Sequence, residues 1–202
     1  MNFLAHFHQA FPCEDLVIGA LQADYLKGVL KGEFPLGIER GIMLHRAIDA
    51  FTDHHACQSA CRQHFSQPLK RYSSILLDLS FDHFLSLNWK QFHSEELPDF
   101  SKKIYRILRS GEKYFCFQSS HMAKRLQEFD ILCLYHKWET VIATAERIGR
   151  RFKRSNPFVN IDAELATLYP VIEDAFVSFY PELCGFVEEI QFEPQTSNII
   201  KI

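Results

Sequence analysis

Several features that mark other classes of protein are missing from this sequence of 202 residues. Glycine and proline number only eight each, fewer turn-forming residues than an all-β protein needs. No run of 18 apolar residues occurs, so we expect no membrane-spanning segment. Residues 1–6 also lack the basic start and long apolar stretch of a secretory signal. These absences favour a helical protein that is neither secreted nor embedded in a membrane.

The six cysteines include no C-x-x-C pair. Cys57 and Cys61 share the i,i+4 spacing that could hold zinc, but no second cysteine pair exists to complete such a site. Scattered cysteines in a chain with a large apolar content are typical of reduced, buried thiols. We therefore expect a cytoplasmic protein without disulfides.

A basic excess is also missing, since the formal net charge is −3. A protein that binds duplex DNA usually carries such an excess, so we expect no nucleic-acid partner. The charge is uneven along the chain. Residues 1–100 hold 8 Lys and Arg against 12 Asp and Glu, whereas residues 101–202 hold 14 against 13.

What is present is a helical pattern of apolar residues along most of the chain. It predicts a single all-α domain over residues 1–190 and a frayed tail over 191–202. Proline should interrupt the last helix at Pro170 and at Pro181. The expected helices cover 14–31, 37–51, a segment ending near 65, 72–92, 99–110, 120–128, 136–154 and 160–190.

The segment 75–86 carries the strongest chemical signal. It is apolar nearly all round, so its helix should be buried, yet Asp78 and Asp82 lie one turn apart on one face. Two buried carboxylates repel each other and are costly to desolvate. A cation should therefore lie between them. A divalent metal would serve, and so would an internal salt bridge to Arg46 or Arg71.

A second pair has the same spacing, because His45 and Asp49 are also one helical turn apart. Taken alone, this pair also fits a capped surface helix. Together with Asp24, His6 and the two buried aspartates, it favours a metal site or an acid–base site. Other templates are absent: the sequence has no HExxH, Glu-x-x-His, GxGxxG, P-loop or GxSxG motif.

The order and spacing of several motifs across residues 1–92 resemble the acyl carrier protein phosphodiesterase family. The motifs are Met-Asn-Phe-Leu-Ala-His at 1–6, Gly19-x4-Asp24, Gly-Ile-Met-Leu-His-Arg-Ala-Ile-Asp-Ala-Phe-Thr-Asp at 41–53, Arg71-Tyr72, Asp78-x3-Asp82-His83-Phe84-Leu85 and Trp89. The resemblance implies an all-helical bundle related to the HD-type metal-dependent phosphohydrolases. It also implies cleavage of the phosphodiester bond between 4′-phosphopantetheine and a serine of holo acyl carrier protein. Manganese is the favoured metal in that family, with Mg²⁺ or Fe²⁺ as alternatives.

With this resemblance in view, roles can be predicted for individual residues. Asp24, His45, Asp49 and Asp82 are the expected metal ligands. His6 and His83 are candidates for supporting a ligand or for general acid–base work, because a leaving serine oxygen needs a proton. Asp78 would orient a ligand or hold a second metal. Arg46 would bind phosphate or form a salt bridge.

Basic clusters in the second half suit an acidic carrier protein as partner. Arg150, Arg151 and Arg154 are the predicted docking residues, alongside Arg147 and Lys153, and a second basic group lies over 102–113. Solvated helix faces would explain both clusters without a partner. Two other functions also fit the sequence: an HD-like phosphohydrolase acting on nucleotides, and a non-enzymatic module that binds carrier protein. The oligomeric state is not determined by these patterns.

Overall fold

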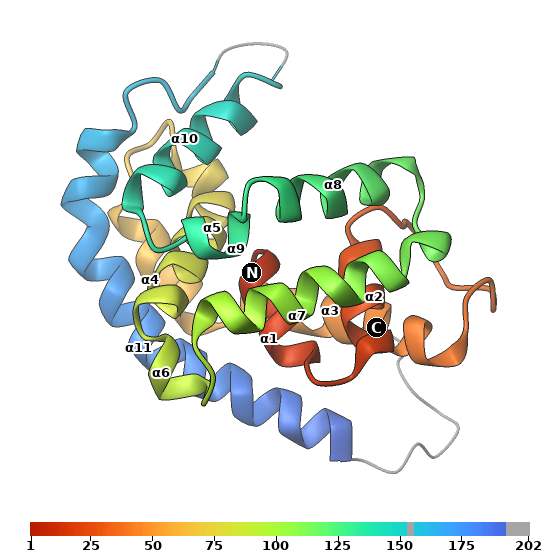
Figure 1. The fold of residues 1–202 in the computed structure, drawn as a ribbon. Helices are drawn as coiled ribbons and strands as arrows, with labels where there is room; N and C mark the ends of the chain where they lie inside the picture. Colours follow the sequence, from red (N-terminus) through yellow and green to blue (C-terminus); the bar gives the residue numbers. More distant parts are fainter. Residues whose placement is uncertain (153–155, 193–202) are drawn as a thin grey trace.

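The computed structural model describes residues 1–152 and 156–192, and within these ranges the fold is all helical (Figure 1). Its α-helices, in chain order, are α1 (Phe3–Ala10), α2 (Glu14–Ala23), α3 (Leu36–His54), α4 (Ala56–His64), α5 (Ser73–Leu87), α6 (Trp89–Phe92), α7 (Leu97–Ser110), α8 (Phe117–Glu128), α9 (Ile131–Leu134), α10 (Trp138–Gly149) and α11 (Asp162–Phe192). Short 3-10 turns lie at Lys70–Tyr72 and Glu112–Tyr114. No helix in the described ranges has the length and apolarity needed to cross a membrane.

The all-α class is confirmed, but several predicted helix boundaries differ from the structure; the helix expected over 136–154, for example, ends at Gly149. The helix expected over 14–31 ends at Ala23 instead, and residues 24–35 form a loop. Gly28 and Gly32 adopt positive φ angles of 80° and 76°, a backbone conformation that glycine tolerates and that a helix cannot contain. Helix α1 was missed, because its eight residues are too few for a clear period. The predicted frayed tail begins at residues 191 and 192, which belong to α11, and its remainder lies outside the described residues.

The predicted interruption of the last helix is also wrong, because α11 runs from Asp162 to Phe192 and contains Pro170 and Pro181. Figure 1 shows that this helix changes direction along its length. A proline removes one backbone hydrogen bond and bends a helix, but packing can hold both halves in place. Here Phe176, Phe179 and Tyr180 are fully buried and anchor the helix.

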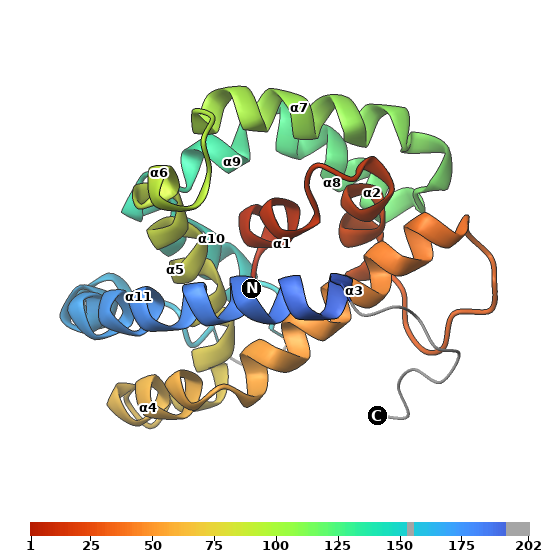
Figure 2. The same ribbon diagram turned by 90° about the horizontal axis from the view of Figure 1, so that it is seen from below.

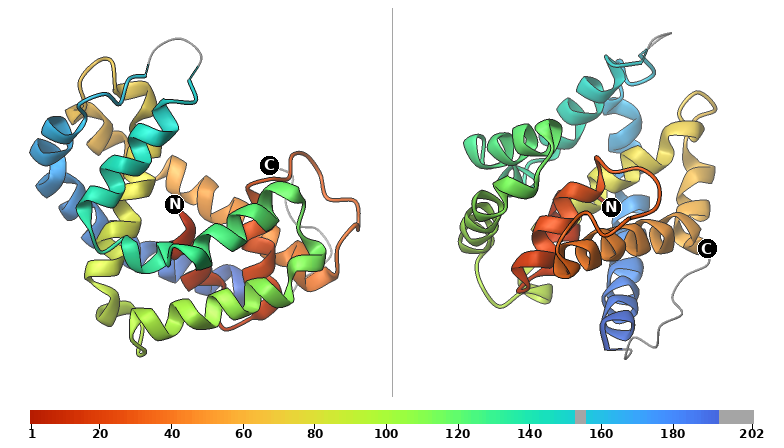
Figure 3. Two further views of the ribbon diagram at one scale, coloured as in Figure 1. Left: turned by 45° about the horizontal axis from the view of Figure 1, so that its top comes forward. Right: turned by 90° about the vertical axis from the view of Figure 1, so that its right-hand side faces the viewer.

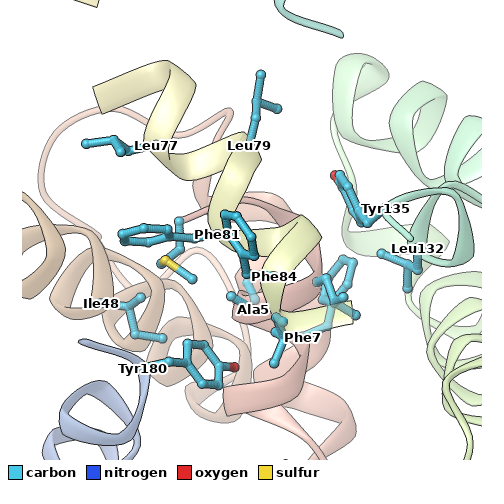
Figure 4. Packing of buried hydrophobic residues seen from close by; sticks show 14 of the residues in the cluster. Ala5, Phe7, Ile48, Leu77, Leu79, Phe81, Phe84, Leu132, Tyr135 and Tyr180 are labelled. Atoms are coloured by element: carbon cyan, nitrogen blue, oxygen red, sulfur yellow. The ribbon is translucent and has the colours of Figure 1, made fainter. Parts of the chain in front are cut away.

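Helix α5 lies at the centre of the core. It contacts α1, α4, α10 and α11, and Phe81 and Phe84 on it are fully buried (Figure 4). Phe7 from α1, Ile48 from α3 and Tyr180 from α11 pack around them. This burial confirms that the apolar segment around 75–86 is an internal helix.

Helices α2 and α3 cross at unusually close range because glycine occupies both sides of the crossing. A Cβ atom on Gly19 would lie 2.2 Å from the carbonyl oxygen of Ile38, and one on Gly41 would lie 2.5 Å from that of Leu16. The close approach sets the position of the carboxyl end of α2 relative to α3. Asp24 follows the one helix and His45 belongs to the other, so this crossing positions candidate site residues.

Candidate functional site

Candidate residues from four helical elements meet around the start of the chain. Figures 1 and 2 show the N-terminus inside the helical array, close to α1 and α5. His6 comes from α1, Asp24 follows α2, His45 and Asp49 come from α3, and Asp78 comes from α5. Residues that are far apart in the sequence are thus brought together, as their chemistry predicted.

The innermost part of the site consists of His6, His45 and Asp49. One potential ligand atom from each lies within 4.8 Å of the others. Nε2 of His6 is 3.1 Å from Oδ1 of Asp49, and Nε2 of His45 is 3.1 Å from its Oδ2. The two imidazole rings stack with centroids 3.8 Å apart. Asp24 joins this group through its Oδ1, which lies 3.4 Å from Nε2 of His45.

This environment shifts the pKa values of His6 and His45 in opposite directions. Burial, together with the neighbouring His45, lowers the pKa of His6 to about 4. Burial also disfavours a charged His45, but hydrogen bonds to Asp24 and Asp49 outweigh it and raise its pKa to about 9. Burial opposes ionisation of Asp49 as well, yet contacts with His45 and His6 hold its pKa well below the usual range. The centre therefore contains an ionised carboxylate and a neutral His6 at pH 7.

These side chains fit a divalent metal ion. Both ring nitrogens of His6 and Nδ1 of His45 are buried without a hydrogen-bond partner in the described structure, and the Nε2 of His6 lies near Asp49 without hydrogen-bond geometry. Buried polar atoms are normally satisfied, so such nitrogens suggest a missing ligand. Imidazole and carboxylate together suit Mn²⁺, Fe²⁺ or Zn²⁺. His6, predicted as a supporting residue, lies as close to Asp49 as the predicted ligand His45, each through its Nε2 but at a different carboxylate oxygen.

The cation expected at the aspartate pair is found beside Asp78, where it is the amino group of Met1, and not between Asp78 and Asp82. Its nitrogen lies 2.9 Å from Oδ1 of Asp78 and 3.6 Å from Oδ1 of Asp49. The salt bridges considered for Arg46 and Arg71 do not occur among the described residues. Burial raises the pKa of Asp78, and the neighbouring ammonium opposes that rise. Sequence patterns did not reveal this group, because every chain has an amino terminus and only the fold shows where it lies.

Asp82 is held by the backbone and not by the imidazole cluster. It is fully buried and accepts hydrogen bonds from the N–H groups of Leu4 at 2.7 Å and Ala5 at 3.2 Å. These donors belong to the first turn of α1, where Asn2 provides no side-chain cap. A helix amino end needs such acceptors and favours negative charge. Asp82 therefore has a structural role: it fixes the position of α1, the helix that contains His6.

We expect Asp82→Ala to destabilise the fold by about 2 kcal/mol at pH 5, because two buried N–H groups lose their acceptor. Asp82→Asn keeps one acceptor oxygen and should cost less. Burial raises the pKa of Asp82 from 3.8 to about 7, so the folded protein holds the proton more tightly than the unfolded chain. The unfolding free energy contributed by this group therefore falls as pH rises from about 4 to about 7. In denaturant titrations across that window, replacement of Asp82 should remove this group's contribution to the slope in both variants, and a slope equal to the parent's in both would contradict the assignment.

His83 lies outside the cluster, although it follows Asp82 directly. Its Nδ1 is 2.7 Å from the carbonyl oxygen of Tyr135, to which it donates, and its Nε2 is 3.2 Å from the hydroxyl of Tyr169. Trp138 contacts the same ring. Burial lowers the pKa of His83, so the ring is held neutral among aromatic side chains. The structure does not bring this predicted acid–base residue to the other candidates.

Among the residues that the structure describes, Arg46 forms no salt bridge and binds backbone carbonyl oxygens instead. Its guanidinium donates to the carbonyl oxygens of Gly28 at 2.8 Å and Leu26 at 3.2 Å. Both acceptors lie in the loop over residues 24–35, which begins with Asp24. Arg46 is thus placed to hold this loop, and with it Asp24, beside His45.

Arg46→Gln should free that loop while leaving the helices intact. Loss of two charge-assisted hydrogen bonds should accelerate hydrogen exchange at the amides of residues 25–34 by at least about tenfold. Hydrogen-exchange mass spectrometry measures this directly. Arg62→Gln, which changes an exposed residue of α4, is the matched control. Equal protection of the loop in both variants would show that Arg46 does not hold it.

The predicted docking residues have separate environments. Arg150 lies 3.9 Å from Glu146 at the end of α10, and Arg151 is exposed. Arg154 and Lys153 lie outside the described residues. The second basic group is partly neutralised, since Lys102 pairs with Asp99 and Lys103 pairs with Glu95.

Comparison with known proteins decides the family. A family model described as acyl carrier protein phosphodiesterase matches residues 1–183. The chain belongs to the acyl carrier protein phosphodiesterase family. A relative of that name from Klebsiella pneumoniae (strain 342) is 32% identical over 202 residues, with 95% of this chain and 100% of the relative covered. Another from Yersinia pestis is 30% identical over 195 residues, covering 91% and 95%.

A third relative, from Serratia proteamaculans, is 40% identical over 104 residues, about half of each chain. No solved structure matches the chain significantly, so kinship with the HD-type bundle stays a prediction. Family membership confirms the resemblance drawn from the sequence motifs.

Proposed function

We propose that this chain hydrolyses the phosphodiester bond that joins 4′-phosphopantetheine to the serine of holo acyl carrier protein. The products would be apo carrier protein and 4′-phosphopantetheine. The observation that carries the proposal is the convergence of His6, His45 and Asp49 in a chain of this family. The six cysteines are free thiols, which is compatible with activity in the cytoplasm.

We further propose that the reaction depends on a divalent metal, with manganese as the first candidate and magnesium or iron as alternatives. His6, His45 and Asp49 would hold it, with Asp24 beside His45. Such an ion activates water and stabilises charge on phosphoryl oxygens. Asp82 and Asp78 would then support the ligands without binding the metal. Asp82 would position α1, and Asp78 would hold the amino group of Met1.

Proton transfer can be assigned from the surroundings of the histidines. His6 is neutral at pH 7 because its pKa is about 4, so its free nitrogens suit it to bind an ion or to accept a proton from water. His83 uses both nitrogens in contacts with Tyr135 and Tyr169. We therefore favour His6 over His83 for a chemical role, and we assign His83 to packing around α5.

The carrier protein is proposed to approach the carboxyl end of α10. Arg150 and Arg151 lie at that end, and Arg154, which is outside the described residues, is the third predicted docking residue. Their positive charge would complement an acidic carrier protein. Charge attraction of this kind mainly raises the rate of encounter. Turnover at saturating substrate should then be insensitive to these residues.

The test is direct: the purified chain is incubated with holo carrier protein and Mn²⁺, and the carrier is weighed by mass spectrometry. Loss of the phosphopantetheine mass, abolished by a chelator and restored by Mn²⁺, is the expected result. A panel of nucleotides tested for phosphate release addresses the alternative phosphohydrolase. Binding of carrier protein without any cleavage, in a chain free of metal, would instead identify a binding module.

A further inference from the structure

The amino group of Met1 lies inside the fold, on the acidic face of α5. Met1 is buried, and its nitrogen lies 2.9 Å from Oδ1 of Asp78. One turn later on the same helix, Asp82 accepts hydrogen bonds from the N–H groups of Leu4 and Ala5. In both views of Figure 3 the N-terminus lies within the outline of the fold, beside α1. Helix α5 therefore holds the first five residues of the chain, which lead directly into the imidazole site.

The same amino group also contacts the cluster of imidazoles and carboxylates. Its nitrogen lies 3.6 Å from Oδ1 of Asp49. His6 contacts that oxygen too, at 3.1 Å through its Nε2, whereas His45 contacts Oδ2. An α-amino group is cationic at pH 7, because its ordinary pKa is about 8. The ammonium of Met1 therefore bridges a carboxylate of α3 and a carboxylate of α5, directly beside the candidate metal ligands.

The charges at this place suit one divalent ion together with the ammonium. Asp24, Asp49 and Asp78 carry three negative charges when all are ionised, and imidazoles that bind a metal are neutral. One divalent ion and one ammonium balance these three charges. A second divalent ion would leave two positive charges in excess, and like charges at close range in a partly buried site repel strongly. The chain thus provides at Asp78 the cation that a second metal ion would otherwise provide.

We propose that the amino group of Met1 is a fixed cation of this site and occupies the position at Asp78 and Asp49 in place of a second metal ion. The inference rests on the proposed function for the metal ion held by His6, His45 and Asp49. The amino group would be a positioning group, which holds Asp49 through Oδ1, the oxygen that His6 also contacts. Asp78 would then bind no metal, in contrast to one of the roles that its sequence position predicts.

Counting the bound ions tests the first part of the proposal. Mn²⁺ is titrated into the metal-free parent protein and into Asp78→Asn, and the unbound Mn²⁺ is measured by electron paramagnetic resonance. We expect one ion per chain in both proteins. Two ions in the parent and one in Asp78→Asn would show that Asp78 holds a second metal, and the proposal would be overturned.

The second test removes the ammonium by adding a single residue. Two forms are released from a cleavable fusion, one beginning at Met1 and one with a glycine before Met1, which turns the amino group into an uncharged amide. Asp78 should lose its cation in the glycine form, so the metal-free protein should melt about 3–6 °C lower. With holo carrier protein, kcat should fall by about tenfold or more at an unchanged KM, as is typical when a group that supports a metal ligand is removed.

A crowding effect of the added residue is separated by comparing the same two forms in Asp78→Asn. This variant has already lost the ion pair, so the glycine should lower its melting temperature much less than that of the parent. Asp174→Asn, which changes an exposed aspartate of α11, is the matched control, and there the glycine should act as it does in the parent. Equal losses in the parent and in Asp78→Asn would show that the glycine acts through its size, and the proposal would be wrong.

Chemical labelling checks the position of the amino group without any added residue. Acetic anhydride near pH 7 modifies an α-amino group ahead of lysine, whose ordinary pKa of about 10.4 is higher. In the metal-free parent, Met1 should be labelled at least about tenfold more slowly when folded than in urea, as measured by mass spectrometry. Folded Asp78→Asn should be labelled faster than the folded parent. Equal rates in the folded and the unfolded parent would overturn the proposal.

These measurements also separate the proposal from the proposed function. Melting and labelling use metal-free protein and no substrate. If both give the expected results but holo carrier protein is not cleaved, the amino group keeps its place in the site and the proposed reaction fails. If holo carrier protein is cleaved and the glycine form matches the parent in kcat and melting temperature, the reaction stands and the proposed role of the amino group fails.

Discussion

Asp49→Asn is expected to abolish hydrolysis of holo carrier protein, with kcat reduced by at least about 10³-fold. Asp49 contacts Nε2 of both His6 and His45, so within the described part of the chain it is the carboxylate that joins the two imidazoles. Asparagine keeps the shape of the side chain but removes the negative charge that would hold a divalent ion. A catalytic metal contributes several kcal/mol to transition-state stabilisation, and each 1.36 kcal/mol changes the rate tenfold.

Metal analysis of the purified variant provides the readout that activity alone cannot give. We expect the Mn²⁺ content after dialysis to fall from near stoichiometric to background, while the circular dichroism spectrum stays helical. Asp174→Asn, an exposed aspartate of α11, is the matched control and should keep both metal and activity. Full activity with normal metal content in Asp49→Asn would remove Asp49 from the site. Loss of activity with full metal content would give it a role other than ligand.

The local features that govern this site could be predicted from the sequence. One-turn spacing places His45 beside Asp49, and the apolar surroundings of Asp78 imply a buried cation. Both follow from helical geometry and from the cost of burying charge. Motif order also identified the family correctly.

Features that depend on tertiary contacts could not be predicted in the same way. The amino group of Met1 and the backbone of α1 satisfy Asp78 and Asp82, over separations of 77 and 78 residues. Arg46 binds loop carbonyls, a partner that no spacing rule indicates. The neighbours Asp82 and His83 point to different surroundings because successive helical residues are about 100° apart. Adjacency in the sequence therefore gave no guide to shared function.

The last prediction concerns the crossing of α2 and α3, where Gly19→Ala should have the largest effect on stability. The added methyl carbon would lie 2.2 Å from the carbonyl oxygen of Ile38 and 2.8 Å from Cα of Gly41. All of these are backbone atoms, so no side chain can rotate away and the helices must separate. We expect a loss of about 3 kcal/mol or more, and a melting temperature lower by about 6–12 °C.

Gly185→Ala is the matched control, because a methyl group there meets nothing within 4 Å and alanine favours a helix. That variant should melt at or slightly above the parent temperature. Separation of α2 from α3 also moves Asp24 away from His45, whose contact is already 3.4 Å long. Gly19→Ala should therefore bind Mn²⁺ more weakly even at temperatures where it remains folded. An unchanged melting temperature in Gly19→Ala would show that the backbones of α2 and α3 are not in close contact at Gly19.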